Sequence, residues 1–346
     1  MTDVRVSGGV GMRRGILVVV AAVLCGCGTP PPAQVAKVAD DAAKVKQAKE
    51  ARAVAAKQVK ANELGQIPVL MYHRIIDNPG SQDDRTPAKF RADLARLAKD
   101  GYVPITAAEF VTGKIDIPAG KHAVVLTFDD SSPSQLSLDE LGNPKPDTAV
   151  AILREAAAKY EGFRPVATFY VTRDMFGKST PEEQAQTLLW LKDNGFDIGN
   201  HTLDHVNLRS RSREEVARQI MSVQKMVSKF AYHTPVTLAL PYGNQPRKQA
   251  WAQKGSGYAH KGVFLAGYTP SNAPFSKSFD ALNIPRIRAM DRKGDCAQFC
   301  STAWLDWLKD NPDMRYTSDG DAATVAFPKF KAPFLRSSFA ARALPY

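Results

Sequence analysis

Short apolar runs recur along the chain from residue 66 onward, and amphipathic segments separate them. Runs at 69–72, 123–126, 166–171 and 236–240, with a further short candidate at 196–200, are typical of buried strands. The segments 86–101, 148–160 and 212–230 have apolar residues at helical spacing, and Asp147 and Ser212 are placed to cap the last two. This alternation predicts one α/β domain over residues 66–346, with parallel strands whose loops gather at their carboxyl ends.

Two adjacent carboxylates follow one of the predicted strands. Asp129 and Asp130 come directly after Thr127-Phe128, at the end of the apolar run at 123–126. Successive strand residues point in opposite directions, so one carboxylate can bind a metal ion while the other remains free as a base. An isolated Asp-Asp pair is more often a turn.

Two histidines four residues apart complete a candidate metal site. His201 and His205 follow the short strand predicted at 196–200, and they share one face if the chain is helical there. Two imidazoles and one carboxylate leave a coordination position open for water, which is how a catalytic zinc site differs from a structural one. The combination predicts a hydrolase with one divalent metal ion, and Zn²⁺ is the expected ion.

These motifs resemble those of the polysaccharide deacetylases related to nodulation-factor and chitin deacetylases, a carbohydrate esterase family. The resemblance covers roughly residues 67–290 and implies a distorted (β/α) barrel. In that family the first aspartate of the pair is the catalytic base and the second is a metal ligand. The resemblance therefore implies that Asp129 is the base and that Asp130, His201 and His205 bind the metal.

Two further family motifs are incomplete in this chain. The family's Arg-x-Pro-Tyr motif lines the substrate groove and offers a backbone N–H to the oxyanion; here it is Ala239-Leu240-Pro241-Tyr242, without the arginine. The late Leu-x-His motif, which supplies the usual catalytic acid, should fall at 284–290, where no histidine occurs. Pro241 and Tyr242 are the expected groove residues, and the acid must come from elsewhere or be lost.

His73 is the candidate for the missing acid. It follows the apolar run at 69–72, so it should stand at the mouth of the first strand. The poly-N-acetylglucosamine deacetylases, a branch that looks circularly permuted, open with a similar Leu-Met-Tyr-His strand and have their acid histidine early. The alternative is a structural histidine hydrogen-bonded at a strand end.

The beginning of the chain has the features of an export signal. Three arginines precede an apolar stretch at 16–24 that is too short to span a bilayer. The tetrapeptide at 24–27 fits the lipobox of bacterial lipoproteins, with the small Gly26 before Cys27. We expect residues 1–26 to be removed and Cys27 to carry a lipid that anchors the protein to a membrane of the bacterial envelope. The alternative is an ordinary secretion signal that ends nearby.

Residues 27–65 are expected to form a tether. A Pro-rich spacer is followed by an Ala/Lys/Val-rich stretch with few large apolar residues, which predicts a solvated helix or a short coiled-coil stalk. The whole chain carries +11, of which +2 lies in 1–26 and +3 in 28–65, leaving +6 for the rest. A basic exported surface suits anionic envelope partners, although a solvated charged face is the commoner explanation. Nucleic acid is not an expected partner.

Four residues near the C-terminus have two interpretations each. Cys296 and Cys300 are expected to form a disulfide in an oxidising compartment, which is favoured over a metal site because no further Cys or His follows. Trp304 and Trp307 lie in a predicted short helix, where core packing is favoured over a role as sugar platforms.

The sequence therefore predicts a lipid-anchored, metal-dependent enzyme that removes N-acetyl groups from an N-acetylated polysaccharide. One alternative is a non-catalytic sugar-binding or envelope-scaffold protein on the same fold, which the two incomplete motifs favour and the intact Asp129 disfavours. A second alternative is an esterase that removes O-acetyl groups. The polysaccharide and the oligomeric state are not specified by these motifs.

Overall fold

The computed structural model describes residues 32–294 and 297–346 of the chain, which divides into two compact units, 1–48 and 49–346. The expected signal peptide and Cys27 lie outside the described residues. Helix α1 (Pro32–Gln58) runs through most of the expected tether. None of the helices described in 32–294 and 297–346 has the length and apolar character that crossing a bilayer requires.

The larger unit begins before the expected boundary at residue 66. Ala56 and Ala61 are buried against Ala326 and Leu344. Small side chains allow this close packing, which the shortage of large apolar residues in the sequence did not indicate. Residues 49–65 therefore belong to the same compact unit as the barrel, and a tether stays a prediction for the residues before 49.

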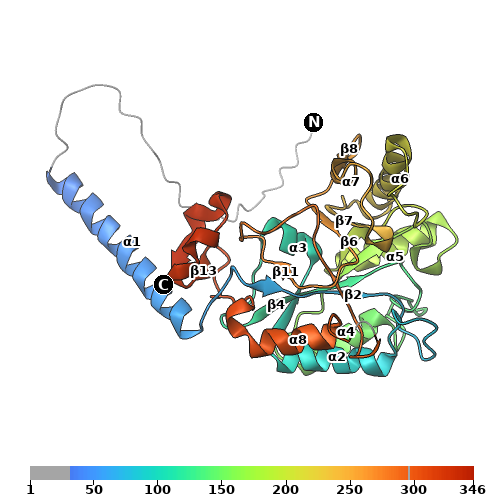
Figure 1. Cartoon of the computed structure of the whole chain (residues 1–346), viewed down its shortest axis with the longest axis horizontal. Helices are drawn as coiled ribbons and strands as arrows, with labels where there is room; N and C mark the ends of the chain where they lie inside the picture. The colour runs from blue at the N-terminus through green and yellow to red at the C-terminus, as the bar shows by residue number, and fades with distance from the viewer. Residues whose placement is uncertain (1–31, 295–296) are drawn as a thin grey trace, which may run out of the picture. The chain divides into compact units, whose positions relative to one another are not determined.

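A curled parallel sheet with helices around it forms the larger unit, which confirms the predicted distorted (β/α) barrel (Figure 1). In sheet order its strands are β10 (Gly262–Phe264), β7 (Thr237–Ala239), β6 (Asp197–Asn200), β5 (Thr168–Val171), β4 (His122–Phe128), β2 (Val69–Tyr72) and β12 (Ile287–Arg288), with β3 (Tyr102–Ile105) also paired to β4. Along β4, Val124 and Leu126 pack toward the helices and Val125 toward the interior, as alternation in a strand requires.

One extended segment, 284–288, joins the two ends of this sheet. Ile284 forms a parallel bridge with Phe264 of β10, and Ile287 pairs with Leu70 of β2. Arg286 lies between these two pairings. Its position at the closure of the barrel is decisive for the site described below.

Helices cover the outer face of the sheet. They are α2 (Pro87–Lys99), α3 (Ala107–Thr112), α4 (Ala149–Lys159), α5 (Pro181–Asp193), α6 (Arg213–Ala231), α7 (Ala250–Gln253) and α8 (Ser301–Asp310). In Figure 1, α8 lies beside α2 at the lower edge, where Arg96 of α2 pairs with Asp306 of α8 at 2.5 Å. Ser212 caps α6 as expected, but α4 is capped by Thr148 and not by Asp147, whose φ is +64°.

The amino ends of the strands are covered by the C-terminal part of the chain, and we call this the sealed end of the barrel. It contains η4 (Pro312–Met314), β13 (Val325–Phe327), η5 (Lys329–Phe334), η6 (Ser337–Arg342) and β14 (Ala343–Pro345). The amide of Tyr316 donates to the carbonyl of Gln66 and that of Ser318 to Lys121, each at 2.9 Å. Short elements elsewhere are β1 (Gln66–Ile67), paired with β11 (Ser271–Asn272), β8 (Lys254–Gly255), paired with β9 (Tyr258–Ala259), η1 (Met175–Gly177) and η2 (Pro241–Gly243).

Glu63 is enclosed at the sealed end. Its carboxyl accepts hydrogen bonds from the Tyr316 hydroxyl and the Ala326 amide, both at 2.8 Å. Burial and the nearby Asp319 carboxylate raise the pKa of Glu63 to about 8. At neutral pH this carboxyl is therefore mostly protonated, and it joins three segments of the chain without placing a charge among them.

Candidate metal centre and active site

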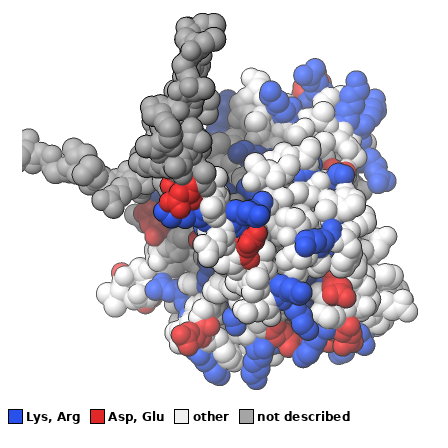
Figure 2. Space-filling view, turned by 90° about the vertical axis from the view of Figure 1, so that its left-hand side faces the viewer, with Lys and Arg blue, Asp and Glu red and all other residues white. Residues whose placement is uncertain are grey.

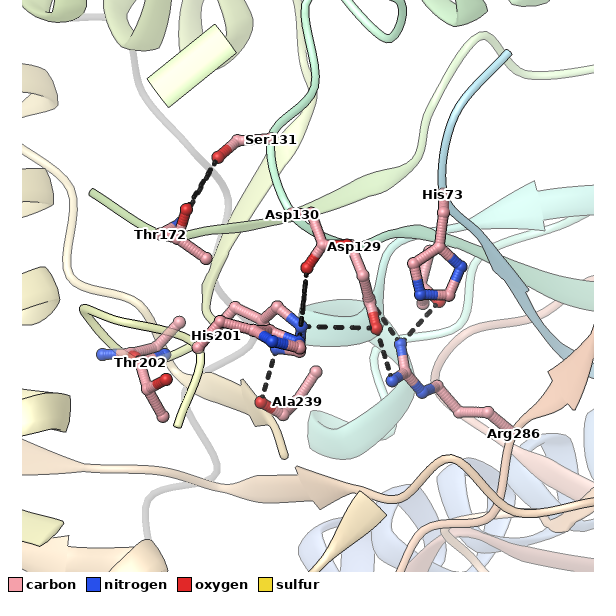
Figure 3. Close-up of polar contacts among 12 residues, drawn as sticks. His73, Asp129, Asp130, Ser131, Thr172, His201, Thr202, Ala239 and Arg286 are labelled. Atoms are coloured by element: carbon pink, nitrogen blue, oxygen red, sulfur yellow. Dashed lines mark hydrogen bonds and ion pairs between the residues drawn. The ribbon is translucent and has the colours of Figure 1, made fainter. Parts of the chain in front are cut away.

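A pocket of about 520 Å³ opens at the carboxyl ends of the strands, and we call it the catalytic pocket. The structure brings the predicted base, acid and metal ligands together in it (Figure 3). Its lining includes His73, Asp129, Asp130, His201, His205 and Tyr242, together with Arg74, Ser81, Asp83, Asp84, Arg286 and Arg288. Pro241 is buried next to Tyr242 and is not part of the lining.

Asp130, His201 and His205 form a group of ligand atoms that could hold a metal ion. Asp130 Oδ1 lies 3.4 Å from His201 Nε2 and 3.5 Å from His205 Nε2, and all three ligand atoms lie within 4.8 Å of one another. Ligand atoms about 2.0–2.2 Å from a tetrahedral zinc ion lie about 3.3–3.6 Å apart. The spacing and the donor types therefore fit a divalent metal ion.

The His201 ring is oriented by the backbone. Its Nδ1 contacts the Ala239 carbonyl oxygen at 2.8 Å, so Nδ1–H donates there and Nε2 points toward the other ligands. Nε2 is buried without a hydrogen-bond partner among the described residues, as a ligand atom facing a metal position should be. Ala239 stands where the family motif has its arginine, and here its carbonyl orients a ligand.

The loops at the pocket have unusual backbone conformations. His205 has a φ of +49°, Thr202 of +66° and Asp130 of +73°, and Tyr242 in η2 has +60°. Positive φ is costly for residues other than glycine, above all for a β-branched threonine. The chain is not helical at His201 and His205, which was the condition for the two histidines to share a helical face. Residues 201–206 form a loop that brings the two rings together, with centroids 4.9 Å apart.

Asp129 is paired with an arginine that the sequence motifs did not identify. Arg286 donates to both carboxylate oxygens of Asp129, at 2.6 and 2.7 Å, and both side chains are buried. Its Nε donates to the Leu265 carbonyl and its Nη1 to the Thr127 hydroxyl. The sequence motifs placed an arginine at position 239; the structure supplies one from the segment that closes the barrel, 157 residues after Asp129.

This arginine determines the ionisation of Asp129. Burial raises the pKa of the carboxyl, but the charges of Arg286 and His201 outweigh it and hold the pKa well below its usual value. Asp129 is therefore ionised at neutral pH. The carboxylate lies 3.7 Å from His201 Nε2, beside the metal position and outside the ligand group.

His73 faces the same pocket from the end of β2. Its backbone carbonyl and that of Asp129 both accept hydrogen bonds from Gln135 Nε2, at 2.9 and 2.5 Å, which ties the two strand ends together. The Nδ1 atom of His73 is buried without a hydrogen-bond partner among the described residues. A charge on His73 also helps to lower the pKa values of Asp129 and Asp130, so the ring lies within electrostatic reach of both.

Residues 81–84 contribute to the rim of the pocket. Of the segment 131–146, which follows Asp130, only Ser132 lines the pocket; further along, the Gly142 carbonyl accepts a hydrogen bond from the Trp190 indole of α5. Arg74 pairs with Asp84 at 2.7 Å and Arg288 with Asp83 at 2.6 Å, so charges on the rim are balanced.

The expected pairing of Cys296 with Cys300 stays a prediction because Cys296 lies outside the described residues. Cys300 is buried, and its Sγ accepts a hydrogen bond from the Ala303 amide as the N-cap of α8. Trp304 packs partly against the core, whereas Trp307 is 37% exposed, so the interpretation as core residues holds only in part.

Comparison with known proteins supports the predicted family. Residues 116–260 match the family model described as Polysaccharide deacetylase. A chitooligosaccharide deacetylase of Azorhizobium caulinodans is 36% identical over 110 residues, 32% of this chain and 42% of that protein. A peptidoglycan-N-acetylmuramic acid deacetylase of Bacillus subtilis is 28% identical over 127 residues, 37% of this chain and 23% of that protein. The chain thus spans less than half of the length of either relative.

The fold agrees with a solved structure. The Streptococcus pyogenes deacetylase PplD, solved with acetate, superposes with a TM-score of 0.52 at 19% identity, over 70% of this chain and 97% of that one. Residues 116–260 of the barrel are thus similar to the polysaccharide deacetylase family. His73 and Arg286 both lie outside the residues that match the family model, so their placement in the site rests on the structure alone.

Proposed function

We propose that this protein is a metal-dependent hydrolase that removes N-acetyl groups from an N-acetylated polysaccharide of the cell envelope. The observation that carries this proposal is the pairing of a metal-binding group, Asp130, His201 and His205, with a separate ionised carboxylate, Asp129. The family match adds support, since its curated relatives are named as deacetylases of peptidoglycan and of chitooligosaccharide.

Each residue of the site has a separate role in the proposed reaction. When bound, a divalent ion supplies Lewis-acid chemistry, which acidifies water and polarises a carbonyl oxygen. Asp129 accepts a proton from the attacking water, whose oxygen forms a bond to the acetyl carbon. The Tyr242 N–H donates to the oxyanion that develops on the acetyl oxygen. The C–N bond then breaks, acetate leaves, and His73 protonates the departing amine.

The two alternatives differ in what the site must contain. A sugar-binding scaffold was favoured by the missing arginine and the missing late histidine. Arg286 now pairs with Asp129, so one of these two arguments is lost. A buried, ionised carboxylate beside a metal position serves catalysis, whereas a binding site has no use for it. An O-acetyl esterase requires the same groups, and only the products distinguish it.

The central test is an assay of acetyl release. Purified protein loaded with Zn²⁺ is incubated with N-acetylglucosamine oligomers, with peptidoglycan fragments and with an O-acetylated sugar, and the products are analysed by mass spectrometry. We expect loss of N-linked acetyl and a decrease of ~10²- to 10⁴-fold in kcat for Asp129→Asn. Glu63→Gln, a buried carboxyl at the sealed end, is the control and should keep its activity. Release of O-linked acetyl alone would favour the esterase.

The metal assignment is tested without an activity measurement. Asp130→Ala and His205→Ala should lose stoichiometric Zn²⁺, measured by metal analysis after dialysis, because each removes one of three protein ligands. Asp83→Ala, on the rim of the same pocket, is the matched control and should retain the ion. Full metal content in both ligand variants would refute the site.

The role of His73 needs a test of its own. His73→Asn should keep the metal and the fold but lose ~10²- to 10⁴-fold in kcat, and the limb of the pH–rate profile at high pH should change. A variant within a few-fold of the wild type with an unchanged profile would make His73 a structural residue at a strand end.

We further propose that the protein is exported and anchored through a lipid on Cys27, on the basis of the sequence pattern at 1–27. Cys27→Ser should leave the protein unprocessed or release it from the membrane fraction. Normal lipid labelling of this variant would place the anchor elsewhere.

A further inference from the structure

A second cavity of about 920 Å³ lies next to the catalytic pocket, and none of its residues takes part in the reaction described above. Pro285 lines this cavity, whereas the next residue, Arg286, lines the catalytic pocket. Adjacent Cα atoms are about 3.8 Å apart, so the segment that closes the barrel has one hollow on either side of it. A sugar chain that passes around this segment can contact both hollows.

Aromatic side chains from α8 and the residues before it form one wall of this cavity, which we call the aromatic cavity. Phe299, Trp304 and Trp307 line it, and Phe299 and Trp307 are 42% and 37% exposed. The Trp304 indole N–H donates to the Tyr268 carbonyl, and its ring lies 5.6 Å from that of Trp307 at an angle of 82°. The Trp304 ring is thus held in place by the protein, and its polar atom is already satisfied.

Amide and carboxyl side chains form much of the remaining lining. Asn283 bonds to Gln249 and Asp280, and Asn272 donates to the Ser278 carbonyl at 3.1 Å. Such groups both donate and accept, as hydroxyl and acetamide groups of a sugar require. Fixed polar groups on an otherwise apolar wall are typical of small-molecule sites, and the volume lies within their usual range of about 300–1,000 Å³.

The charges of the lining argue for a neutral ligand. Arg292, a cation of the lining, is paired with Asp306 at 3.3 Å. Among the described residues, no other lysine or arginine lines the cavity, and its one carboxylate, Asp280, accepts hydrogen bonds from the Leu282 amide and the Asn283 side chain. A flat, uncharged ring with an apolar face and polar edges fits an aromatic wall and a polar wall together. A pyranose ring of an N-acetylated sugar has this form.

We propose that the aromatic cavity binds a second segment of the polysaccharide, some sugar residues away from the one that is deacetylated. This proposal rests on the function proposed above, and it adds that the enzyme recognises a chain and not a single sugar. A long oligomer occupies both hollows, and the second contact then raises the effective concentration of its reacting residue. A short oligomer reaches only the catalytic pocket.

The kinetic test compares two lengths of N-acetylglucosamine oligomer. For Trp307→Ala we expect KM for the hexamer to rise about tenfold, equivalent to about 1.4 kcal/mol, with kcat unchanged and the dimer unaffected. Phe330→Ala removes an exposed aromatic side chain that lines neither hollow, and it should change the kinetics of neither substrate. Asn283→Ala, from a different segment of the lining, should act in the same direction as Trp307→Ala. Equal effects on dimer and hexamer, or no effect of either variant, would overturn the proposal.

A binding test separates this proposal from the deacetylase activity. Calorimetric titration of His73→Asn protein, which keeps the Asp129–Arg286 pair, with the hexamer should show binding that the added substitution Trp307→Ala weakens about tenfold. If no substrate loses acetyl but this binding is seen, the aromatic cavity stands and the enzymatic proposal falls. If acetyl is released but hexamer binding does not depend on Trp307, the enzyme stands and the aromatic cavity is refuted.

Discussion

Two carboxyl groups are enclosed at opposite ends of the barrel, and their ionisation differs. Asp129, at the end of β4, is 2% exposed, and Glu63, at the sealed end, is 3% exposed. Asp129 is held ionised by two hydrogen bonds from the Arg286 guanidinium. Glu63 accepts from a hydroxyl and a backbone amide, and its pKa is raised to about 8.

The difference shows that the charge of the partner, and not the depth of burial, decides the state of a buried carboxyl. Burial favours the neutral acid in both cases. Only the arginine provides a full positive charge at hydrogen-bond distance, and this outweighs the loss of solvation at Asp129. Neutral donors do not, and the Asp319 carboxylate opposes ionisation of Glu63 further. Asp129 therefore stays ionised as a candidate base, and Glu63 stays uncharged while it hydrogen-bonds to other segments of the chain.

Removal of Arg286 should have the largest effect on stability, because it takes away the charge that distinguishes Asp129 from Glu63. Arg286→Met leaves Asp129 buried without its cation, and we expect the free energy of unfolding to fall by about 3–5 kcal/mol. The double variant Asp129→Asn/Arg286→Met leaves no uncompensated charge and should recover most of the loss in urea denaturation. A single variant as stable as the wild type, or a double variant no better than the single one, would contradict this account.

Ionisation of Glu63 should lower the free energy of unfolding as the pH rises, which ionisation of Asp129 should not do. Its pKa is higher in the folded than in the unfolded protein, so its contribution is complete below about pH 4.5 and is lost as the pH rises through about 8. Glu63→Gln mimics the neutral acid. We expect it to match the wild type at pH 5 and to exceed it by roughly 2–4 kcal/mol at pH 9.

Urea midpoints measured across this range give the difference directly. A difference in urea midpoint that stays constant from pH 5 to pH 9 would show that Glu63 does not titrate in this range.

The smallest expected effect concerns a single hydroxyl. Tyr316→Phe removes the donor to Glu63 and should lower the free energy of unfolding by about 0.5–1.5 kcal/mol. Tyr102→Phe is the matched control, because the Tyr102 hydroxyl is buried without a partner among the described residues and its loss should be neutral or stabilising. Equal losses in both variants would mean that the bond to Glu63 contributes nothing of its own.

The net charge of the chain says less about its partners than the pairing of individual charged residues does. The chain has a net positive charge, yet on the face in Figure 2 basic and acidic side chains are interspersed. The arginines at the rim of the catalytic pocket are likewise paired, Arg74 with Asp84 and Arg288 with Asp83. Net charge alone therefore does not identify an anionic partner, whereas the pairing of individual residues shows that the pocket rim is balanced.

The sequence by itself predicted most of the strands and the group of candidate metal ligands. Apolar runs mark the strands β2, β4, β5 and β7, because strands buried on both faces have few polar positions. Asp129, Asp130 and His201 directly follow strands and His205 lies in the loop after β6, and the carboxyl ends of parallel strands meet at one edge. Local order along the chain was sufficient to predict that these residues lie together.

Only the tertiary structure decided which residues complete the site. Arg286 reaches Asp129 across 157 positions because the segment 284–288 closes the barrel, and no local pattern around an arginine records such a closure. Glu63 lies in a stretch whose composition resembles a solvated tether, and its burial depends on the C-terminal residues that pack over it. Contacts between distant segments arise from the packing of the whole chain, which is why local periodicity could not predict them.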